Sequence, residues 1–286
     1  MEILNKIREM QRFSDAIRAE EKRIGLVPTM GYLHEGHLSL IQLAVQKADL
    51  AVVSVFVNPT QFGPTEDFET YPRDFDRDLG RIEKAGGTVV FAPSVEEMYP
   101  SQCCTYVEVE ELTSGLCGPF RPGHFRGVTT VVAKLFNAVK PHLAVFGQKD
   151  AQQALVIKRM ARDLNMDVEI VVGPTVRERD GLAMSSRNVH LTPEERRNAP
   201  VLYESLKRAE GMIRDGERRV TRITSAMREK IDARLKAEID YISIVDAEQL
   251  QPLEEVKGEI LIALAARVSK VRLIDNIMLS VCSPIT

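Results

Sequence analysis

Short apolar runs and amphipathic stretches alternate along the first 172 residues of the chain. We expect an amphipathic N-terminal helix, because Ile3, Ile7, Met10 and Ile17 recur at helical spacing. Strands are then predicted at 24–27, 50–57, 88–91, 143–146 and 168–172, and helices near 38–48, 73–85, 128–139 and 151–164. This order predicts an α/β fold, a Rossmann-like parallel sheet with helices on both faces.

The pattern changes after Pro174. Residues 175–188 are polar and irregular, and Thr192-Pro193-Glu194-Glu195 has the form of a capping box with proline at the first helical position. Two charged helices are expected near 193–214 and 221–237, and strands near 241–245, 260–266 and 271–276. We therefore predict a Rossmann-like domain of residues 1–175 and a smaller α+β C-terminal domain of residues 176–286.

Composition restricts the class of protein. The 286 residues carry a formal net charge of −3, whereas a nucleic-acid-binding surface is normally clearly basic. Residues 1–23 carry too many charges for a signal peptide, and apolar runs such as 50–57 and 260–266 are too short to span a bilayer. We expect a cytoplasmic protein with no nucleic-acid or membrane partner. Its cysteines are expected to be free thiols: Cys103, Cys104, Cys117 and Cys282.

Two histidines, His34 and His37, lie three residues apart directly after the first strand of the alternating series. The segment from Pro28 to His37 therefore forms a strand-to-helix turn, which directs backbone N–H groups and the positive end of a helix dipole at a bound ligand. Imidazoles at i and i+3 on a first helical turn face the same way. A polyphosphate is the ligand that this arrangement favours.

Zinc binding and an ordinary structural role are the alternatives for these histidines. The zincin pattern has histidines four apart on a continuous helix, with a glutamate between them. Here the spacing is three, Gly36 interrupts the segment, and no third ligand is evident, so the pattern disfavours zinc.

Three other loops carry polar groups that suit a nucleotide or a small acid. Residues 147–153 follow a strand and contain Lys149, a mobile cation that can follow phosphate charge. Residues 184–188 lie in the predicted connection between domains, and their hydroxyls and guanidinium suit a phosphate-binding lid. Asn58 and Gln61 are neutral groups that suit hydroxyls or a carboxylate on a small substrate. Taken singly, each segment could also be an ordinary turn or a solvated linker.

Three common motifs are absent from the sequence. There is no Gly-x-x-x-x-Gly-Lys-Ser/Thr loop of a P-loop kinase and no Gly-x-Gly-x-x-Gly after the first strand of the series. There is also no Gly-x-Ser-x-Gly elbow, which disfavours an α/β-hydrolase.

Four collinear motifs carry a resemblance to a known family. They are PTMGYLHEGH at 28–37, FVNPTQF at 56–62, FGQKD at 146–150 and GLAMSSRN at 181–188. With them the chain resembles the pantothenate synthetase (pantoate–β-alanine ligase) family of the HxGH-type nucleotidyltransferase superfamily. The resemblance extends from about residue 24 to 188, and residues 189–286 fit the family's small C-terminal domain in length and pattern.

The resemblance implies a two-step reaction. The carboxylate of pantoate attacks the α-phosphorus of ATP to give pantoyl adenylate and pyrophosphate, and the amine of β-alanine then displaces AMP to give pantothenate. It also implies Mg2+ as cofactor, a homodimer, and a role in coenzyme A biosynthesis. It leaves the protein ligands of Mg2+ unassigned.

The resemblance further implies roles for individual residues. Catalytic roles fall to His37, His34, Lys149, Ser185, Ser186 and Arg187. ATP would be bound by Met30, Gly31, His34, His37, Gly147, Gln148, Lys149, Asp150, Val176, Met184, Ser185, Ser186 and Arg187. Pantoate and β-alanine would be bound by Met30, Gln61, Gln153, Asn58, Phe62, Val131 and Val132.

Two other functions stay open at this point. The first is another adenylate-forming nucleotidyltransferase of the same superfamily, against which the acidic balance and the neutral pair Asn58 and Gln61 argue. The second is a nucleotide-sensing module without turnover, against which phosphate-binding side chains on three separate loops argue.

Overall fold

The chain folds into two compact units that are not contiguous in sequence. The computed structural model describes residues 1–64 and 66–281. Unit 1 comprises residues 1–110, 121–148 and 153–174, and unit 2 comprises residues 111–120, 149–152 and 175–286. The division into a Rossmann-like domain of residues 1–175 and a smaller α+β C-terminal domain of residues 176–286 stays a prediction.

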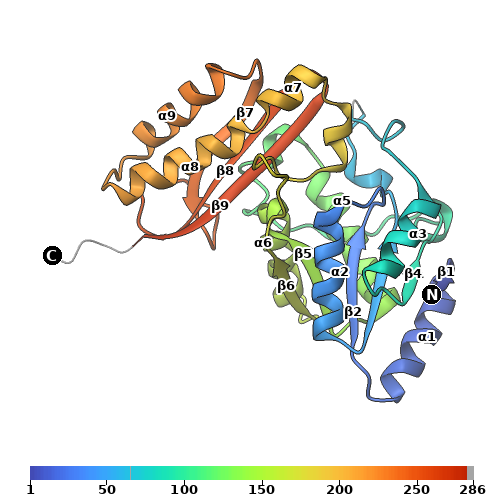
Figure 1. Ribbon diagram of the computed structural model, residues 1–286. Coiled ribbons are helices and arrows are strands. Elements are labelled where there is room, and N and C mark those ends of the chain that lie inside the picture. Colours follow the sequence, from blue (N-terminus) through green and yellow to red (C-terminus); the bar gives the residue numbers. More distant parts are fainter. Residues whose placement is uncertain (65, 282–286) are drawn as a thin grey trace. The chain divides into compact units, whose positions relative to one another are not determined.

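Unit 1 is built on a parallel sheet of six strands (Figure 1). Its spatial order is β1-β4-β3-β2-β5-β6. The strands are β1 (Glu2–Leu4), β2 (Ile24–Thr29), β3 (Leu50–Val55), β4 (Val89–Phe91), β5 (Leu143–Gly147) and β6 (Glu169–Gly173). Because all six run in one direction, the loops after β2, β3 and β5 leave the same edge of the sheet from three adjacent strands.

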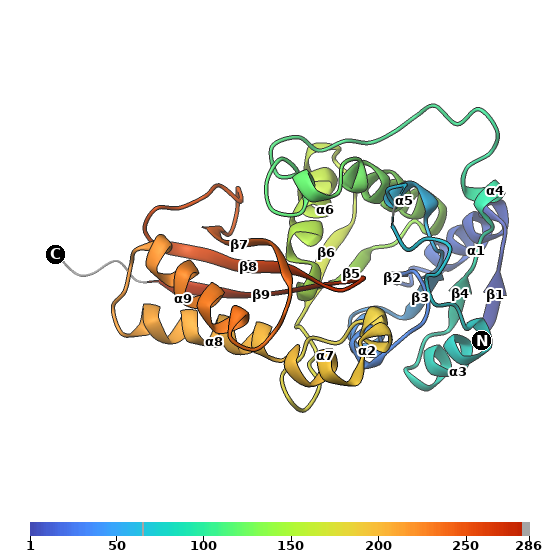
Figure 2. The same cartoon turned by 90° about the horizontal axis from the view of Figure 1, so that it is seen from above.

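Helices cover both faces of this sheet (Figure 2). One face carries α1 (Ile7–Ala19), α5 (His124–Val139) and α6 (Ala151–Asp163), and the other carries α2 (Glu35–Lys47) and α3 (Phe75–Lys84). The two apolar cores of the unit follow this division. Val52 packs with the α1, α5 and α6 side chains, and its neighbour Val53 packs with those of α2 and α3. Successive residues of one strand thus pack into opposite cores, as expected for a sheet that is covered on both faces.

The predicted fold class is confirmed, with local corrections in unit 1. Ile3 lies in strand β1, not in the N-terminal helix, which begins at Ile7. A strand of three residues is too short to show an alternating pattern, which is why the sequence did not reveal it. A short helix, α4 (Val95–Met98), was also missed, and α5 begins four residues earlier than predicted, at His124.

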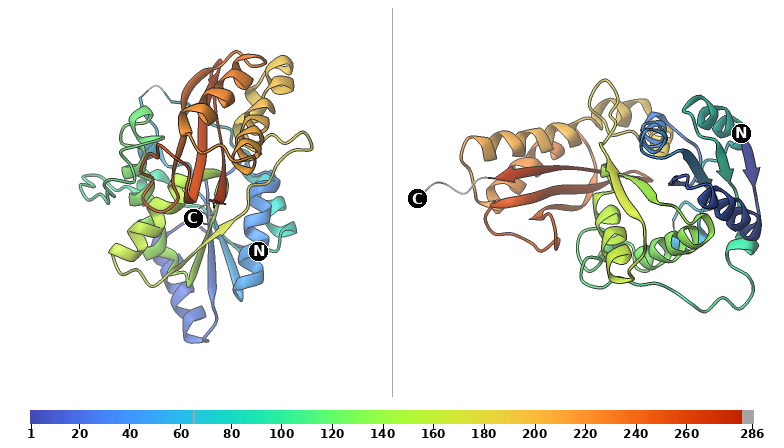
Figure 3. Two further views of the ribbon diagram at one scale, coloured as in Figure 1. Left: turned by 90° about the vertical axis from the view of Figure 1, so that its left-hand side faces the viewer. Right: turned by 90° about the horizontal axis from the view of Figure 1, so that it is seen from below.

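Unit 2 is centred on a three-stranded antiparallel sheet of order β7-β8-β9. Its strands are β7 (Glu238–Asp246), β8 (Gly258–Val268) and β9 (Val271–Val281). Helices α8 (Val201–Arg214) and α9 (Val220–Asp232) lie along one face of the sheet (Figure 3). Leu206, Met227 and Ile262 are fully buried in the shared apolar core.

The predicted helix at 193–214 is two helices, α7 (Pro193–Asn198) and α8. Pro200 lies between them, and proline interrupts a helix because it lacks the backbone N–H and its ring clashes with the preceding turn. The capping box at the start of α7 is confirmed, since Thr192 Oγ1 accepts from the Glu195 N–H and Glu195 Oε2 accepts from the Thr192 N–H.

Residues 111–120, which the sequence left unassigned, belong to unit 2. Gln152 holds this segment: its amide nitrogen donates to the carbonyls of Leu112 and Gly115, and its Oε1 accepts from the Cys117 N–H, all at 2.9 Å. The ring of Phe120 lies 6.0 Å from that of Tyr241 on β7. Two short segments, 111–120 and 149–152, therefore belong to unit 2 although unit 1 precedes and follows each of them in sequence. From Thr175 onward the chain belongs to unit 2.

Cys103, Cys104 and Cys117 are free thiols as predicted, and Cys282 lies outside the described residues. Within the described ranges, no helix combines the length and the apolar character that crossing a bilayer requires.

Candidate active site

The predicted site residues divide between the two units. His34, His37, Met30, Asn58 and Gln61 lie in loops and helix starts of unit 1, at the edge where β2 and β3 end. Lys149, Val176 and residues 184–187 belong to unit 2.

The two histidines are in direct contact at the start of α2. His34 is the N-cap of the helix and His37 is its third residue, and their ring centroids lie 4.0 Å apart. The rings form a reciprocal capping box. His34 Nδ1 accepts from the Gly36 N–H, and His37 Nδ1 accepts from the His34 N–H, both at 3.2 Å. Because His34 caps the helix, α2 begins at Glu35 and not near Leu38 as predicted.

This capping box determines the tautomer of both imidazoles. A ring nitrogen that accepts a hydrogen bond carries no proton, so the proton of each neutral ring resides on Nε2. Both His34 and His37 can therefore donate from Nε2 to an anionic oxygen. The positive end of the α2 dipole favours a negative charge at the same place.

A buried carboxylate, Asp78, shapes the turn that leads to these histidines. It lies on α3, is 1% exposed, and accepts from the N–H groups of Tyr32 at 2.6 Å and Leu33 at 2.7 Å. The turn needs this support because Gly31 and Tyr32 both have positive φ, 81° and 48°. Burial raises the pKa of Asp78, while the bonds from Leu33 and Tyr32 oppose that rise.

Asn58 and Gln61 are brought together at the end of β3. Asn58 is 1% exposed, and its amide nitrogen donates to Gln61 Oε1 and to the Gly127 carbonyl, both at 3.1 Å. Asn58 Oδ1 accepts from the Thr60 and Tyr99 hydroxyls at 2.9 and 2.8 Å. Since its amide is used within the protein, Asn58 orients Gln61, whose Nε2 donates to Met30 Sδ at 3.2 Å.

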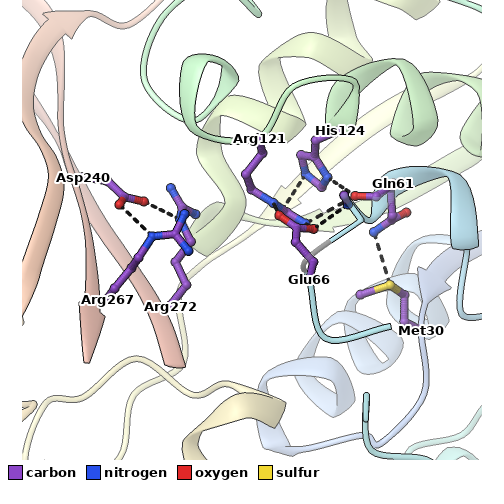
Figure 4. Close-up of polar contacts among 9 residues, drawn as sticks. Met30, Gln61, Glu66, Arg121, His124, Asp240, Arg267 and Arg272 are labelled. Carbon is purple, nitrogen blue, oxygen red and sulfur yellow. Dashed lines mark hydrogen bonds and ion pairs between the residues drawn. The ribbon is translucent and has the colours of Figure 1, made fainter. Parts of the chain in front are cut away.

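The backbone of Gln61 is held by an ionic network (Figure 4). His124 Nδ1 donates to the Gln61 carbonyl at 2.8 Å, and Arg121 Nη2 donates to the same oxygen at 3.3 Å. Arg121 also binds both oxygens of Glu66 at 2.7 Å. Burial alone would raise the pKa of Glu66, but the bond and charge of Arg121 outweigh it and the pKa is lowered.

The remaining predicted substrate residues of unit 1 are apolar or half-buried. Val131 and Val132 lie on α5 in the apolar core with Phe56 and Val128. Phe62 follows Gln61 and packs edge-on against Phe68 and Tyr71, with ring centroids 5.4 and 5.9 Å away. Gln153 is half-buried on α6.

In unit 2, residues 176–184 form a tight hairpin. The Met184 N–H donates to the Val176 carbonyl at 3.0 Å, which joins two residues predicted to bind the nucleotide. A turn closes the hairpin, with the Gly181 N–H donating to the Glu178 carbonyl at 2.9 Å. The 3₁₀ helix Ser186–His190 follows, and Ser185 caps it by accepting from the Arg187 N–H at 3.3 Å.

Strand β9 supports both predicted phosphate-binding segments of unit 2. Asp275 binds Arg177 through two hydrogen bonds of 2.6 and 2.9 Å. Asn276 Nδ2 donates to the backbone carbonyl of Lys149 at 2.9 Å. Lys149 lies in the 3₁₀ helix Gln148–Asp150, directly after β5.

The residues that position the predicted site residues could not be recognised in the sequence. Arg121 and His124 contact Gln61, and Asn276 contacts Lys149, from distant parts of the chain. Asp78 and Asp275 contact residues that adjoin predicted site residues, Tyr32, Leu33 and Arg177. Nothing in their local sequence distinguishes them, because their partners lie between 45 and 127 positions away.

The described residues form no cluster of metal-ligating side chains. Among the described residues, no group of three or more His, Cys, Asp and Glu side chains could hold a metal ion. The described side chains therefore do not fit a protein-bound metal centre.

Comparisons with known proteins identify the family of the chain. The family model described as pantoate-beta-alanine ligase matches residues 2–278. The pantothenate synthetase of Thermotoga neapolitana is 58% identical over 279 residues, covering 98% of this chain and 100% of the relative. That of Acetivibrio thermocellus is 54% identical over 281 residues, again with 98% and 100% coverage.

Solved structures of the same family share the fold. The crystal structure of pantothenate synthetase from Thermus thermophilus superimposes with a TM-score of 0.91 at 46% identity, covering 99% of this chain and all of that one. The ligase from Francisella tularensis, in complex with beta-gamma ATP and beta-alanine, gives a TM-score of 0.80 at 34% identity, with 97% of each chain covered. The fold and the family match define a ligase built on a parallel sheet. The chain belongs to the pantoate–β-alanine ligase family.

Replacing Asp78 by asparagine is expected to lower the ligase turnover number by about 10- to 100-fold. The amide offers only one acceptor oxygen to two N–H donors, so the turn before His34 shifts. Steady-state kinetics measures the change, with the exposed Asp76→Asn on the same helix as control. Turnover equal to that of Asp76→Asn would show that Asp78 does not set the histidine geometry.

Glu66→Gln is expected to lower the free energy of unfolding at pH 7 by about 1–2 kcal/mol, since a charge-assisted bond becomes a neutral one. The folded-state pKa of Glu66 lies below its ordinary value of 4.5, so its contribution is complete above that pH and lost as pH falls through the folded-state pKa. The stability difference from wild type should therefore shrink below about pH 4.5 in denaturant titrations. The exposed Glu229→Gln serves as control, and a difference that grows in acid would contradict this sign.

Proposed function

We propose that the chain condenses pantoate with β-alanine in an ATP-dependent reaction through a pantoyl-adenylate intermediate. The observation that carries the proposal is the reciprocal capping of His34 and His37, which places a proton on Nε2 of both rings at a helix N-terminus. Family membership supports the overall reaction. The complex of the Francisella tularensis relative with beta-gamma ATP and beta-alanine supports the choice of nucleotide and amine.

The first step is adenylation. A carboxylate oxygen of pantoate attacks the α-phosphorus, the bond from that phosphorus to the bridging oxygen breaks, and pyrophosphate leaves with the electron pair. Negative charge grows on the leaving group, so groups that donate hydrogen bonds to it lower the barrier. His34 and His37 would donate from Nε2, and Lys149 and Arg187 would supply positive charge.

The second step is acyl transfer. The amine of β-alanine attacks the acyl carbon of the adenylate, the bond from that carbon to the AMP oxygen breaks, and the amine nitrogen loses a proton. Both nucleophiles are competent once placed, so the protein contributes mainly by positioning them.

Gln61 is the residue that we assign to pantoate. Asn58 orients its side chain, and the bonds from His124 and Arg121 hold its backbone, so its amide is preorganised for a hydroxyl or carboxylate. Val131, Val132 and Phe62 would pack against the gem-dimethyl group, with Met30 and Gln153 as further contacts. Ser185, Ser186, Met184 and Val176 would contact the nucleotide, together with Gly31, Gly147, Gln148 and Asp150.

Three further expectations belong to this proposal. Mg2+ would arrive with the triphosphate of ATP, which supplies oxygen ligands of the kind that the ion prefers. A homodimer is predicted and can be measured by light scattering. A cytoplasmic location follows from the expected place in coenzyme A biosynthesis.

Exchange of labelled pyrophosphate into ATP should require pantoate and proceed without β-alanine. His37→Ala and His37→Asn should both lower this exchange by about 100-fold, the loss expected for one preorganised donor. Asparagine can replace Nδ1 as the acceptor in the capping box but lacks the Nε2 donor. Exchange near the wild-type rate in His37→Asn would show that His37 only caps the helix, and exchange driven by an amino acid would indicate another superfamily activity.

Gln61→Ala should raise the KM for pantoate by about tenfold, the value of one lost hydrogen bond in a desolvated site, and leave ATP affinity nearly unchanged. Kinetics at saturating ATP measures the KM for pantoate, and calorimetric titration with ATP alone measures the affinity for ATP. The exposed Gln46→Ala is the control. Equal weakening for pantoate and ATP would contradict the assignment of Gln61.

A further inference from the structure

Two successive residues of β9, Asp275 and Asn276, connect to two different predicted ATP-binding segments. Both side chains are almost fully buried, with 3% and 5% of the residue exposed. Asp275 reaches Arg177 across 98 positions of sequence, and Asn276 reaches Lys149 across 127. All four residues belong to unit 2.

Asp275 holds the hairpin that precedes the Ser185–Arg187 segment. Its two oxygens bind Arg177 Nη1 at 2.6 Å and Nη2 at 2.9 Å, which fixes the plane of the guanidinium. Arg177 Nη1 also donates to the Gly181 carbonyl at 3.1 Å, and the guanidinium lies 3.7 Å from the ring centroid of Tyr203. The base, the turn and the supporting helix of the hairpin are thus joined through one arginine.

Asn276 holds the backbone of the lysine itself. Its Nδ2 donates to the Lys149 carbonyl at 2.9 Å. This bond fixes the backbone of Lys149, from which the ammonium extends, relative to β9. The two β9 residues are also joined to each other, because the Asn276 N–H donates to Asp275 Oδ1 at 2.7 Å. A shift of either residue is therefore transmitted to both segments.

Stability alone does not account for this arrangement. A buried ion pair such as Arg177–Asp275 contributes little net stability compared with well-packed apolar side chains, because both charges lose their hydration. What the pair provides is a fixed geometry. The hairpin that the pair fixes precedes the hydroxyl and guanidinium groups assigned to phosphate, and Asn276 beside it holds the lysine whose ammonium is assigned to phosphate.

We propose that Asp275 and Asn276 are positioning residues that hold Lys149 and the Ser185–Arg187 segment in one fixed arrangement for the phosphates of ATP. This inference rests on the proposed function. By this inference β9, which is distant in sequence from all four motifs, controls the strength of ATP binding.

The first experiment measures ATP use in Asn276→Asp and Asn276→Ala. Aspartate keeps the size of the side chain but presents an oxygen to the Lys149 carbonyl, so the contact becomes repulsive. We expect the KM for ATP to rise about tenfold or more and the KM for pantoate to change less than about twofold, as one hydrogen bond to a charged or preorganised group is lost. Asn276→Ser is a second variant if either of these fails to fold.

Ser205→Ala is the matched control for a purely structural role. Ser205 is a fully buried polar residue of unit 2 whose hydroxyl donates to the Leu202 carbonyl within α8. Thermal unfolding and kinetics are measured for all variants at a temperature where each is folded. Normal ATP kinetics in the Asn276 variants, with a melting temperature lowered as in Ser205→Ala, would overturn the proposal.

The second experiment asks whether Asn276 acts through Lys149. Lys149→Ala, Asn276→Ala and the double variant form a cycle in which coupled residues are not additive. We expect Asn276→Ala to cost about tenfold in kcat/KM for ATP in the wild-type background and less than about threefold when Lys149 is already alanine. Equal costs in both backgrounds would show that the two residues act independently.

Calorimetric binding of ATP alone separates failure of this inference from failure of the proposed function. If wild-type protein binds ATP but shows no pantoate-dependent exchange, the proposed reaction is wrong. Weaker ATP binding in the Asn276 variants would still support their positioning role. If exchange proceeds and the Asn276 variants bind ATP like wild type, the proposed reaction stands and the positioning role is wrong.

Discussion

The geometry of the two histidines depends on the hydrogen bonds that the turn before them makes to the carboxylate of Asp78. A strand-to-helix turn with two successive residues at positive φ is unfavourable for an L-residue such as Tyr32. Two short hydrogen bonds from the turn to one buried carboxylate offset that cost. With the turn fixed, His34 begins α2, and the reciprocal cap with His37 then sets the tautomer of both rings. The geometry of the imidazoles thus depends on Asp78 of α3. Both oxygens of this carboxylate accept hydrogen bonds from the turn, so Asp78 acts by positioning.

The same principle recurs around the other candidate residues. Gln61 is held by Asn58 through its side chain and by His124 through its carbonyl, and Lys149 is held by Asn276 through its backbone. In each case the proposed ligand-binding residue has a flexible or neutral side chain, and the residue that positions it is buried. Ligand-binding geometry is more precise when the supporting residues are themselves fixed by packing and hydrogen bonds. Short-range sequence motifs therefore mark the residues that touch ligands, and the tertiary fold supplies their precision.

This division explains how much the sequence could predict. Strands β2, β3 and β5, the histidine turn and the capping box of α7 were predictable, because their signals lie within a few neighbouring residues. Strand β1 was too short to carry a pattern, and the break at Pro200 was outweighed by the helical spacing on either side. The start of α2 was placed too late because histidine is rarely an N-cap. Asp78 and Asn276 could not be found, since a buried acid or amide has no local signature of its distant partner.

The interrupted course of the chain limits how this enzyme can be dissected. Residues 149–152 belong to unit 2, yet they are covalently flanked on both sides by strands and helices of unit 1. A fragment ending at Pro174 would keep both imidazoles and Lys149 but would lose the β9 amide that holds the lysine carbonyl. A fragment beginning at Thr175 would keep that amide and lose the lysine. A chimaera of two family members joined at a single point near residue 175 would therefore combine the lysine of one protein with the β9 of the other. A chimaera that keeps these contacts needs the 111–120 and 149–152 segments exchanged together with the C-terminal region.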